Sequence, residues 1–319
     1  MNLGGTVHVN KKGFFVLLFC TIILFIYLYS HNGTEKVINR INLRKLLAVA
    51  VQAAENGGRE VVEIRNNLKI ESKGKTKEGA NDSVTTADYK SHCVMLHNLK
   101  ANFPTVQVIS EESIECGDDY SSTGTMEFDG LIDEWVHEDN IRVWIDPLDA
   151  TQEYTEKLYE YVTTMVCVAI NGAPVIGVIH KPFLRTTSWA WVGKSNSFDA
   201  IKPREDNVLK FIVSRSHTGK VKEAINEAFK EKEVEIISAG GAGYKVLEVV
   251  NGKADAYLHV TAIKKWDICA GNAILNALGG RMTTKQNTVI NYSDSDDVVN
   301  ENGLIATLKN HQYYVDKLK

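Results

Sequence analysis

Hydrophobic and polar positions follow one another along the chain in blocks that predict the order of its helices and strands. Phe14–Tyr29 is an uninterrupted apolar run without a charge. As a helix it would span roughly 24 Å, slightly less than a typical bilayer core but compatible with the thinner membranes of the early secretory pathway. Ile41–Arg65 then carries leucine, alanine and valine at helical spacing, and Gly57-Gly58 is expected to bend or interrupt that helix.

The apolar run predicts a membrane anchor. We expect a cytosolic tail over residues 1–13, a transmembrane signal-anchor over residues 14–30 and a stem over residues 31–40. A removable signal peptide would need a small-residue cleavage site, which does not follow, and a buried core helix is not expected at this end of the chain. The predicted topology is single-pass type II, with the bulk of the chain in a lumen.

Two further patterns bear on this topology. Lys11 and Lys12 favour a cytosolic N-terminus, although basic residues also follow the apolar run. Glycosylation sequons begin at Asn32, Asn81 and Asn291, which fits a luminal glycoprotein, although such triplets also occur by chance.

Between the first long helix and residue 192, the chain predicts one helix followed by strands. The helix would carry Met95, Leu96 and Leu99, and Asp88 could be its N-cap. Residues 69–81 are charged and poor in apolar side chains, which predicts a loop. The dipeptide Asn171-Gly172 stands between two apolar segments and is the strongest short signal for a hairpin. Strands are predicted over residues 106–109, 143–145, 161–170, 173–180 and 186–192.

After a polar stretch over residues 193–207, predicted strands and helices alternate regularly. The strands cover residues 211–214, 234–238 and 254–260, and the helices that follow them cover residues 220–230, 243–250 and 267–278. This alternation is typical of an α/β layer. We therefore predict an α+β domain over residues 41–200 and an α/β domain over residues 201–319.

Charge and cysteine content narrow the function classes. The net charge of −4 argues against general nucleic-acid binding, which needs a basic face, but leaves small anionic ligands open. The five cysteines match no zinc motif and no dense disulfide framework. Cys167 and Cys269 are expected to be small buried hydrophobic residues, with a single bridge left open.

The stretch that most suggests chemistry is Asp146-Pro147-Leu148-Asp149, which follows the strand over residues 143–145. Two carboxylates three residues apart, together with a Leu148 carbonyl that has no obvious donor, are hard oxygen ligands of the kind that Mg²⁺ prefers. The amides that follow Asp149 can also hold a phosphate at a helix start. Taken alone, Asp-Pro is a turn signal.

Four acidic features lie at the end of a predicted strand or the start of a predicted helix: Asp88, Glu111-Glu112, the Asp146–Thr151 stretch and Trp266-Asp267. From about residue 41 onward, this set and order resemble the lithium-sensitive, Mg²⁺-dependent phosphomonoesterases, which include inositol monophosphatases, inositol polyphosphate 1-phosphatases and 3′-nucleotidases. The resemblance implies a layered αβαβα sandwich. The run from Asp146 to Glu156 is most similar to the bisphosphate nucleotidase branch.

The resemblance implies roles for individual residues. Asp88 and Thr151 would orient and deprotonate the attacking water. Glu112 matches no metal-binding role and is expected to support the site from outside or to be solvated. Two or three Mg²⁺ ions would be held by Glu111, Asp146, the Leu148 carbonyl, Asp149 and Asp267, and Li⁺ would inhibit by occupying one of these sites.

Physical reasoning supports a metal requirement. Close carboxylate pairs repel by about 4 kcal/mol at an effective dielectric near 20, and bare carboxylates would also repel a phosphate. Bound cations would remove this repulsion and activate water. Ala150 stands where most of the superfamily has glycine. A left-handed backbone there would strain an alanine, so we expect a negative φ, at which alanine costs nothing.

Substrate choice is expected to involve the second domain, together with Thr151 and Asp267. Ser214 and His217 resemble the nucleotidase segment that contacts the nucleotide, although Ser214 could equally cap a helix and His217 could lie on the surface. Gly241 resembles the nucleotidase glycine near the adenosine.

Three lysines could add positive charge near the acidic residues. Lys245 resembles the nucleotidase lysine near the second phosphate, whereas an isolated helix lysine is usually solvated. Lys264 and Lys265 precede Trp266-Asp267 and could raise the local potential or be plain surface residues.

The resemblance predicts hydrolysis of the 3′-phosphate of 3′-phosphoadenosine 5′-phosphate to AMP and phosphate. With the predicted anchor, this implies a Golgi membrane enzyme whose luminal domain clears the by-product of sulfation. An inositol phosphatase is the first alternative, and Gln152-Glu153-Tyr154-Thr155 disfavours it. A non-catalytic membrane-tethered binding protein is the second, and it would predict a broken metal set. No nucleic-acid partner is expected, and the oligomeric state is left open.

Overall fold

The structure, a computed structural model, divides into two units, residues 1–40 and residues 41–319, which are described separately. The residues that it describes are 10–32, 39–67, 69–75, 81–117, 127–200, 206–215 and 218–318.

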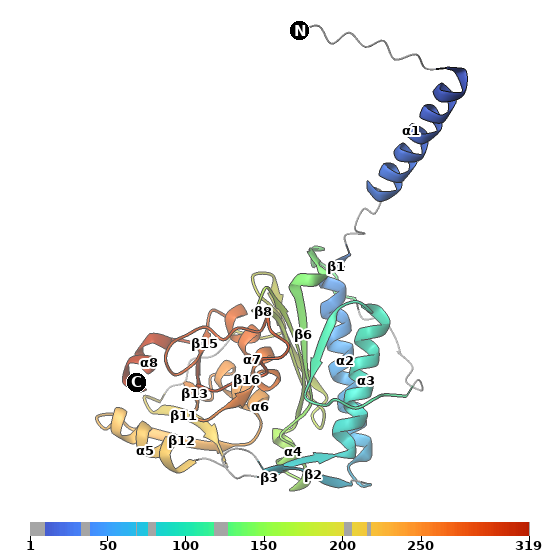
Figure 1. The fold of residues 1–319 in the computed structure, drawn as a ribbon. Coiled ribbons are helices and arrows are strands. Elements are labelled where there is room, and N and C mark those ends of the chain that lie inside the picture. The colour runs from blue at the N-terminus through green and yellow to red at the C-terminus, as the bar shows by residue number, and fades with distance from the viewer. Residues whose placement is uncertain are drawn as a thin grey trace, which may run out of the picture. The chain divides into compact units, whose positions relative to one another are not determined.

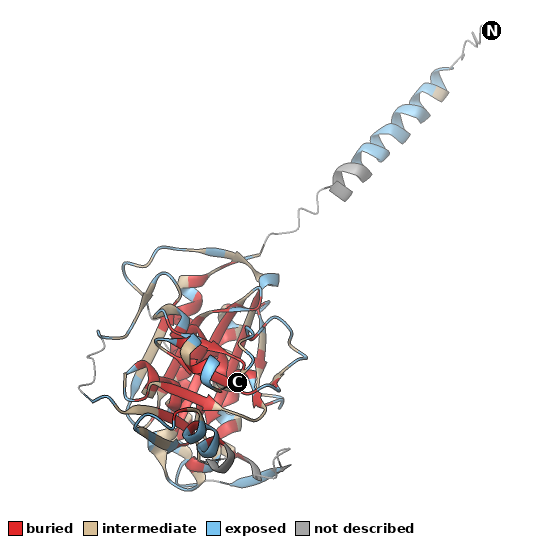
Figure 2. Cartoon of the chain, turned by 90° about the vertical axis from the view of Figure 1, so that its left-hand side faces the viewer, coloured by how far each residue is buried: buried red, intermediate tan, exposed pale blue. Residues whose placement is uncertain are grey.

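In its described residues the first unit contains one helix, α1 (Lys11–Asn32), and residues 14–26 of this helix are exposed (Figure 2). The helix covers the predicted apolar run, but in the described part of the chain no helix is long and apolar enough to cross a membrane. The expectation of a transmembrane segment over residues 14–30 is therefore not supported.

The second unit is built on a six-stranded sheet in the order β10-β9-β8-β7-β6-β4. The strands β4 (Gln107–Ser110) and β6 (Ile141–Asp149) are parallel, and the other neighbours are antiparallel. The remaining strands are β7 (Thr163–Ile170), β8 (Ala173–Lys181), β9 (Thr186–Trp191) and β10 (Ser195–Asn196).

The hairpin between β7 and β8 turns at Asn171 and Gly172, where both residues have positive φ angles of 51° and 82°. This matches the two-residue turn that the sequence predicts.

Two long helices cover one face of this sheet (Figure 1). The helices α2 (Leu43–Ile64) and α3 (Thr86–Asn102) pack with alternate β6 and β7 residues, including Val143, Ile145 and Val166, into one apolar core. Contrary to expectation, α2 runs through Gly57-Gly58 without interruption. A Cβ at Gly57 would come within 2.6 Å of Ser91 Oγ on α3, so the glycine permits the close helix contact.

The intervening β-strand residues face the opposite side and join a second core with α6 (Ala242–Val250) and α7 (Lys265–Ala277). Trp144 and Met165 belong to this second core, as alternation along a strand requires. Gly177 on β8 lies directly under α7, because a Cβ there would overlap the Ala270 carbonyl.

A five-stranded sheet in the order β12-β11-β13-β17-β15 forms the next layer. Its strands β11 (Leu209–Ser214), β12 (Val234–Ala239) and β13 (Ala256–His259) are parallel. The antiparallel strands β15 (Arg281–Thr283) and β17 (Leu304–Thr307) complete it. A third core packs this sheet against α5 (Thr218–Ala228) and α8 (His311–Leu318), so the predicted αβαβα layering is confirmed.

Smaller elements correct one further expectation and complete the topology. The predicted loop over residues 69–81 contains strand β2 (Ile70–Lys75), which pairs with β3 (Asn81–Thr85). The segment after residue 114 contains strand β5 (Trp135–His137), which pairs with β1 (Arg40–Asn42), and a 3-10 turn over Glu138–Asn140. Two other short strands, β14 (Ile263–Lys264) and β16 (Val299–Asn300), pair with each other.

The cysteines also differ from expectation, since the structure contains two disulfides, Cys93–Cys116 and Cys167–Cys269. The second bridge joins β7 to α7 across the interior core. The half-cystines Cys167 and Cys269 are therefore buried as expected but bonded to each other.

Candidate active site

The Asp146–Asp149 segment is an irregular end of strand β6. Asp146 pairs with Met165 and Asp149 pairs with Thr163, so three steps on β6 oppose two steps on β7. Residues three apart normally point to opposite faces of a strand, but the one-residue bulge brings both aspartates to the same face. That face is the one covered by α6 and α7. Proline fits the bulge because it needs no ladder hydrogen bond.

The next residue, Ala150, has φ 72° and ψ 45°, which is left-handed backbone. The expectation of a negative φ is therefore wrong, and the alanine carries a strain of about 1–2 kcal/mol. This turn ends the strand and starts α4 (Thr151–Thr155) at once. The turn at Ala150 thus directs Thr151, the first residue of α4, toward the bulge.

Thr151 and Asp88 come together as predicted. Thr151 Oγ1 lies 3.1 Å from Asp88 Oδ1 and 3.1 Å from the Leu148 carbonyl oxygen. The Leu148 carbonyl therefore has a possible donor, which the sequence did not reveal. The other Asp88 oxygen accepts hydrogen bonds from Thr85 N and Thr85 Oγ1 at 2.7 and 2.6 Å. Thr85, rather than Asp88, is the N-cap residue of α3.

Asp149 is tied to the start of α6. Its two oxygens accept hydrogen bonds from the amides of Ala242 and Gly243 at 3.0 and 2.8 Å, and from Thr163 Oγ1 at 3.0 Å. Gly241 has φ 62°, and a Cβ there would come within 2.7 Å of the Tyr161 carbonyl oxygen, so glycine is needed at this approach. The metal ligand predicted at Asp149 thus also holds α6 against the bulge.

Lys245 is the buried cation of this cluster. It lies on α6 with only 4% of its surface exposed, and its ammonium group lies 5.2 Å from the centre of the Tyr257 ring. Burial lowers the lysine pKa to about 8, while the charges of Asp149, Glu153 and Asp267 act in the opposite direction. The reading of Lys245 as an ordinary solvated residue is therefore excluded.

Glu111 and Glu112 lie in the loop that follows β4. The Glu111 amide lies 3.4 Å from the Ile145 carbonyl, which continues the pairing of β4 with β6. Glu112 is buried, with 5% exposed, so it is not solvated. Its negative charge contributes to the raised pKa of Asp88, which places it on the side of the predicted water-activating pair.

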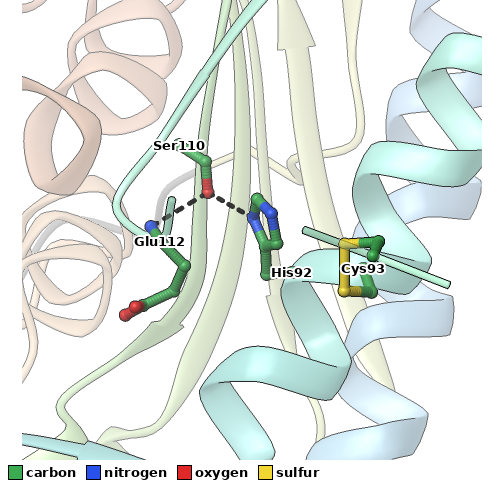
Figure 3. Close-up of a disulfide and its surroundings, with 5 residues drawn as sticks. His92, Cys93, Ser110 and Glu112 are labelled. Atoms are coloured by element: carbon green, nitrogen blue, oxygen red, sulfur yellow. Dashed lines mark hydrogen bonds between the residues drawn. A yellow bond between two sulfur atoms is a disulfide. The ribbon is translucent and has the colours of Figure 1, made fainter. Parts of the chain in front are cut away.

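A disulfide and a histidine fix this loop to α3. Figure 3 shows the Ser110 hydroxyl between the His92 ring and the Glu112 amide, at 2.8 and 3.3 Å. The next residue on α3, Cys93, is bonded to Cys116. The segment that carries Glu111 and Glu112 is thereby held at both ends to the helix that carries Asp88.

Asp267 lies in the first turn of α7, and Lys264 precedes that helix. Lys264 is exposed over the Trp266 ring, whereas Lys265 is buried and pairs with Asp297 at 2.8 Å. Lys264 lowers the pKa of Asp267, first through a backbone hydrogen bond and then through its charge.

The acidic residues influence one another strongly. Burial raises the pKa of Asp88 to about 6, and burial together with Asp149 raises that of Asp267 to about 8. Asp146 has a pKa well above its usual value, first because it is buried and then because Glu111, Asp149 and Asp267 are negative. Such a cluster of carboxylates is stabilised by binding either protons or cations.

These residues fit a hard divalent cation by donor chemistry, since carboxylates and a carbonyl oxygen are the ligands that Mg²⁺ prefers. The carboxylate oxygens lie further apart than the prediction of one shared metal site implies. In the described part of the chain, no three of the carboxylates have oxygens within 4.8 Å of one another. The ligand roles of Glu111, Asp146, Leu148, Asp149 and Asp267 stay predictions.

The second sheet places two of the predicted substrate-binding residues at one edge. Ser214 and Ala239 end the parallel strands β11 and β12 in register, so Ser214 and Gly241 lie at the same edge. His217 lies outside the described residues. A cavity of about 300 Å³ lies apart from these residues, and its lining includes Arg44, Lys45 and Phe128.

The structural roles of three residues near the site were not predicted from the sequence. Thr85 could have been found, because Thr85 and Asp88 have the spacing of a capping box. Glu153 and Arg215 could not, because their 3.0 Å ion pair joins segments far apart in the chain. Neither residue type is informative in isolation.

The chain is similar in sequence to known proteins. A profile described as the inositol monophosphatase family matches residues 42–319. Inositol monophosphatase 3 of Xenopus tropicalis is 50% identical over 292 residues, covering 87% of this chain and 81% of that protein. The Golgi-resident adenosine 3′,5′-bisphosphate 3′-phosphatase of Rattus norvegicus is 49% identical over 293 residues, covering 87% and 82%.

Solved structures show the same fold. The extragenic suppressor protein suhB from Bartonella henselae aligns with a TM-score of 0.64 and 20% identity, over 86% of this chain and 98% of that one. CysQ from Bacteroides thetaiotaomicron, a bacterial member of the family, aligns with a TM-score of 0.59 and 21% identity, over 84% and 98%. The family profile and the two close relatives lead to one conclusion: this chain belongs to the inositol monophosphatase family.

Proposed function

We propose that the protein is a divalent-metal-dependent phosphatase that removes the 3′-phosphate of adenosine 3′,5′-bisphosphate, giving AMP and inorganic phosphate. The observation that carries the chemistry is the contact between Thr151 and Asp88 at the edge of the Asp146–Asp149 bulge. The name and 49% identity of the Rattus norvegicus relative support the choice of substrate.

The residues act in defined roles in this proposal. Asp88 holds the Thr151 hydroxyl, and the hydroxyl orients a water molecule for attack on phosphorus. The proton released from that water passes through the hydroxyl to Asp88, whose raised pKa suits it to accept a proton near neutral pH. Thr151 needs to form no covalent bond to the substrate.

Glu111, Asp146, the Leu148 carbonyl, Asp149 and Asp267 would hold the divalent metal, with Mg²⁺ the expected ion. When bound, the metal would supply positive charge to the phosphate and lower the pKa of water. The protein's part is to present these oxygens on one face and to keep them dry. Li⁺ is expected to inhibit through the same residues.

Residues of the second sheet would select the nucleotide. Lys245 is a buried positive charge beside the cluster, suited to the second phosphate. Ser214 and Gly241 lie at the sheet edge nearest to it and would contact the nucleoside, with His217 a further candidate. We therefore propose that residues 41–200 carry the metal ligands and residues 201–319 complete the site.

We also propose residence in the Golgi, following the name of the same relative. The two disulfides are consistent with an oxidising compartment of the secretory pathway. There the enzyme would act on the nucleotide left by sulfate transfer.

One second candidate has a specific observation in its favour. The Xenopus tropicalis relative carries the name inositol monophosphatase 3 at 50% identity, so an inositol phosphate is the alternative substrate. Phosphate release from both substrates, with Mg²⁺ and with EDTA, separates the two. Metal-dependent release from the nucleotide supports the proposal, and release from the inositol phosphate alone would replace it.

A further inference from the structure

Arg215 joins the second sheet to the helix that carries Thr151. It directly follows β11, and its amide donates to the Ala239 carbonyl at 3.2 Å, which fixes it to β12. Its guanidinium reaches α4, where Nη1 lies 3.0 Å from Glu153 Oε1 and Nη2 lies 3.0 Å from Glu156 Oε2.

Both glutamates are held in place for this contact. Glu156 also accepts a hydrogen bond from Gln152 Nε2 at 2.9 Å, so its second oxygen is occupied. Glu153 packs on Gly240, because a Cβ on that glycine would overlap the Glu153 side chain. The Glu153 side chain is 12% exposed, whereas those of Arg215 and Glu156 are 34% and 38% exposed, so only the Glu153 end of the contact is shielded from solvent.

The helix needs external support. It has five residues, far fewer than the ~12–15 at which an isolated helix becomes marginally stable. It also starts from the strained residue Ala150. On one flank, Tyr154 Oη donates to the Val61 carbonyl at 2.8 Å, which anchors the helix to α2. On the other flank, Arg215 anchors it to the second sheet.

We propose that Arg215 is a positioning residue for catalysis. By pairing with Glu153 and Glu156, it fixes α4 and so holds the Thr151 hydroxyl against Asp88. The Arg215 side chain then links the two sheets. It fixes the edge of the second sheet, where the substrate is proposed to bind, relative to Thr151 and Asp88. The kinetic part of this inference rests on the proposed phosphatase function, whereas the structural part does not.

The test compares Arg215→Ala, Arg215→Lys, Glu156→Gln and the double variant Arg215→Ala/Glu156→Gln in the full chain. The matched control is Arg44→Ala, which removes an ion pair to Asp133 with similar exposures of 36% and 44%. Two measurements are made on each protein. One is kcat and KM for adenosine 3′,5′-bisphosphate with Mg²⁺, and the other is amide hydrogen exchange over residues 151–158.

We expect Arg215→Ala to lower kcat by about 10- to 100-fold, the scale of a misplacement near 1 Å, with a smaller change in KM. Exchange over residues 151–158 should accelerate while exchange in α2 is unchanged. Arg215→Lys should recover part of kcat because a single charge still reaches one glutamate. The double variant should be no worse than Arg215→Ala, since the residues act as a unit. Arg44→Ala should match the wild type.

Other results would contradict the inference. A kcat within twofold of wild type in Arg215→Ala, together with unchanged exchange, would overturn the inference. A rise in KM alone would show that Arg215 contacts substrate instead. If the wild type does not hydrolyse the nucleotide, the proposed function fails, and the exchange measurement still decides whether Arg215 fixes α4.

Discussion

Thr151 and Asp88 are brought within 3.1 Å of each other from two different strand–helix junctions. Asp88 is fixed by the capping box at the start of α3, and Thr151 is fixed by the left-handed turn at Ala150. The pair therefore depends on backbone geometry at both junctions. This relationship is the structural basis of the proposed chemistry.

The first prediction concerns the threonine hydroxyl. Thr151→Ala should lower kcat by about 100-fold or more, because general-base assistance typically contributes that much. Thr155→Ala is the matched control in the same helix, since its hydroxyl bonds to the Gln152 carbonyl. Steady-state phosphate release measures both. Equal activity of the two variants would contradict the role of Thr151.

The second prediction concerns Ala150. Its φ of 72° makes Ala150→Gly stabilising by about 0.5–1 kcal/mol, because glycine adopts this conformation without strain. Ala101→Gly is the control, since that residue lies in the regular backbone of α3 and should lose about 1 kcal/mol. Urea unfolding of both variants gives the free energies. A loss at Ala150 as large as that at Ala101 would contradict the left-handed turn.

How far the sequence predicts the structure depends on whether a feature is local. The hairpin at Asn171-Gly172 and the long helices follow from local patterns, and the structure confirms them. The acidic residues stood out through their spacing and their place at element ends. The bulge could not be foreseen, since it depends on pairing with β7.

Four features have no signal in their own segment. The φ of Ala150 results from the strand end and the helix start on either side of it, and alanine by itself favours the opposite sign. The two disulfides and the pairing of Arg215 with α4 join residues distant in sequence. The buried state of Lys245 likewise depends on packing around Tyr257.

The third prediction concerns pH in metal-free protein. Asp88 and Asp267 have folded-state pKa values of about 6 and about 8, above the ordinary value of 3.8 that they regain on unfolding. At these two aspartates the folded state thus binds more protons between pH 4 and pH 8. Burial lowers the pKa of His92, His180 and His311, which acts in the opposite direction below about pH 6.5, so the fall in stability with rising pH should be clearest between pH 6.5 and pH 7.5.

Melting temperatures in EDTA from pH 5 to pH 7.5 test this expectation. Added Mg²⁺ should raise the melting temperature more at pH 7.5 than at pH 5, because the carboxylates must ionise to bind it. A melting temperature in EDTA that rises between pH 6.5 and pH 7.5 would contradict the raised pKa values.

The fourth prediction separates the two disulfides. Replacing Cys167 and Cys269 by serine should cost about 4–5 kcal/mol of stability, because that bridge closes a loop of 102 residues. Replacing Cys93 and Cys116 should cost about 3 kcal/mol, for a loop of 23 residues.

The shorter bridge should have an additional effect. Since it holds the segment with Glu111 against α3, its loss should raise the Mg²⁺ concentration needed for half-maximal activity. Metal titrations of the two double variants, at a temperature where both are folded, provide the measurement. A rise in the Cys167/Cys269 variant alone would contradict the assignment.

The fifth prediction addresses the metal site through Asp146. This carboxylate is buried, with 1% exposed, and repelled by its neighbours, so Asp146→Ala should fold and should melt no lower than the wild type in EDTA. It should nevertheless have no measurable turnover. Near-normal activity of a folded Asp146→Ala protein would show that the aspartate is not part of the catalytic site.

The most direct test of the account is release of phosphate from adenosine 3′,5′-bisphosphate by the purified wild-type protein with Mg²⁺, followed by identification of the nucleotide product. The account predicts AMP and phosphate in equal amounts, with no release in EDTA. Release that persists in EDTA, or no release from this nucleotide while an inositol phosphate is hydrolysed, would contradict it.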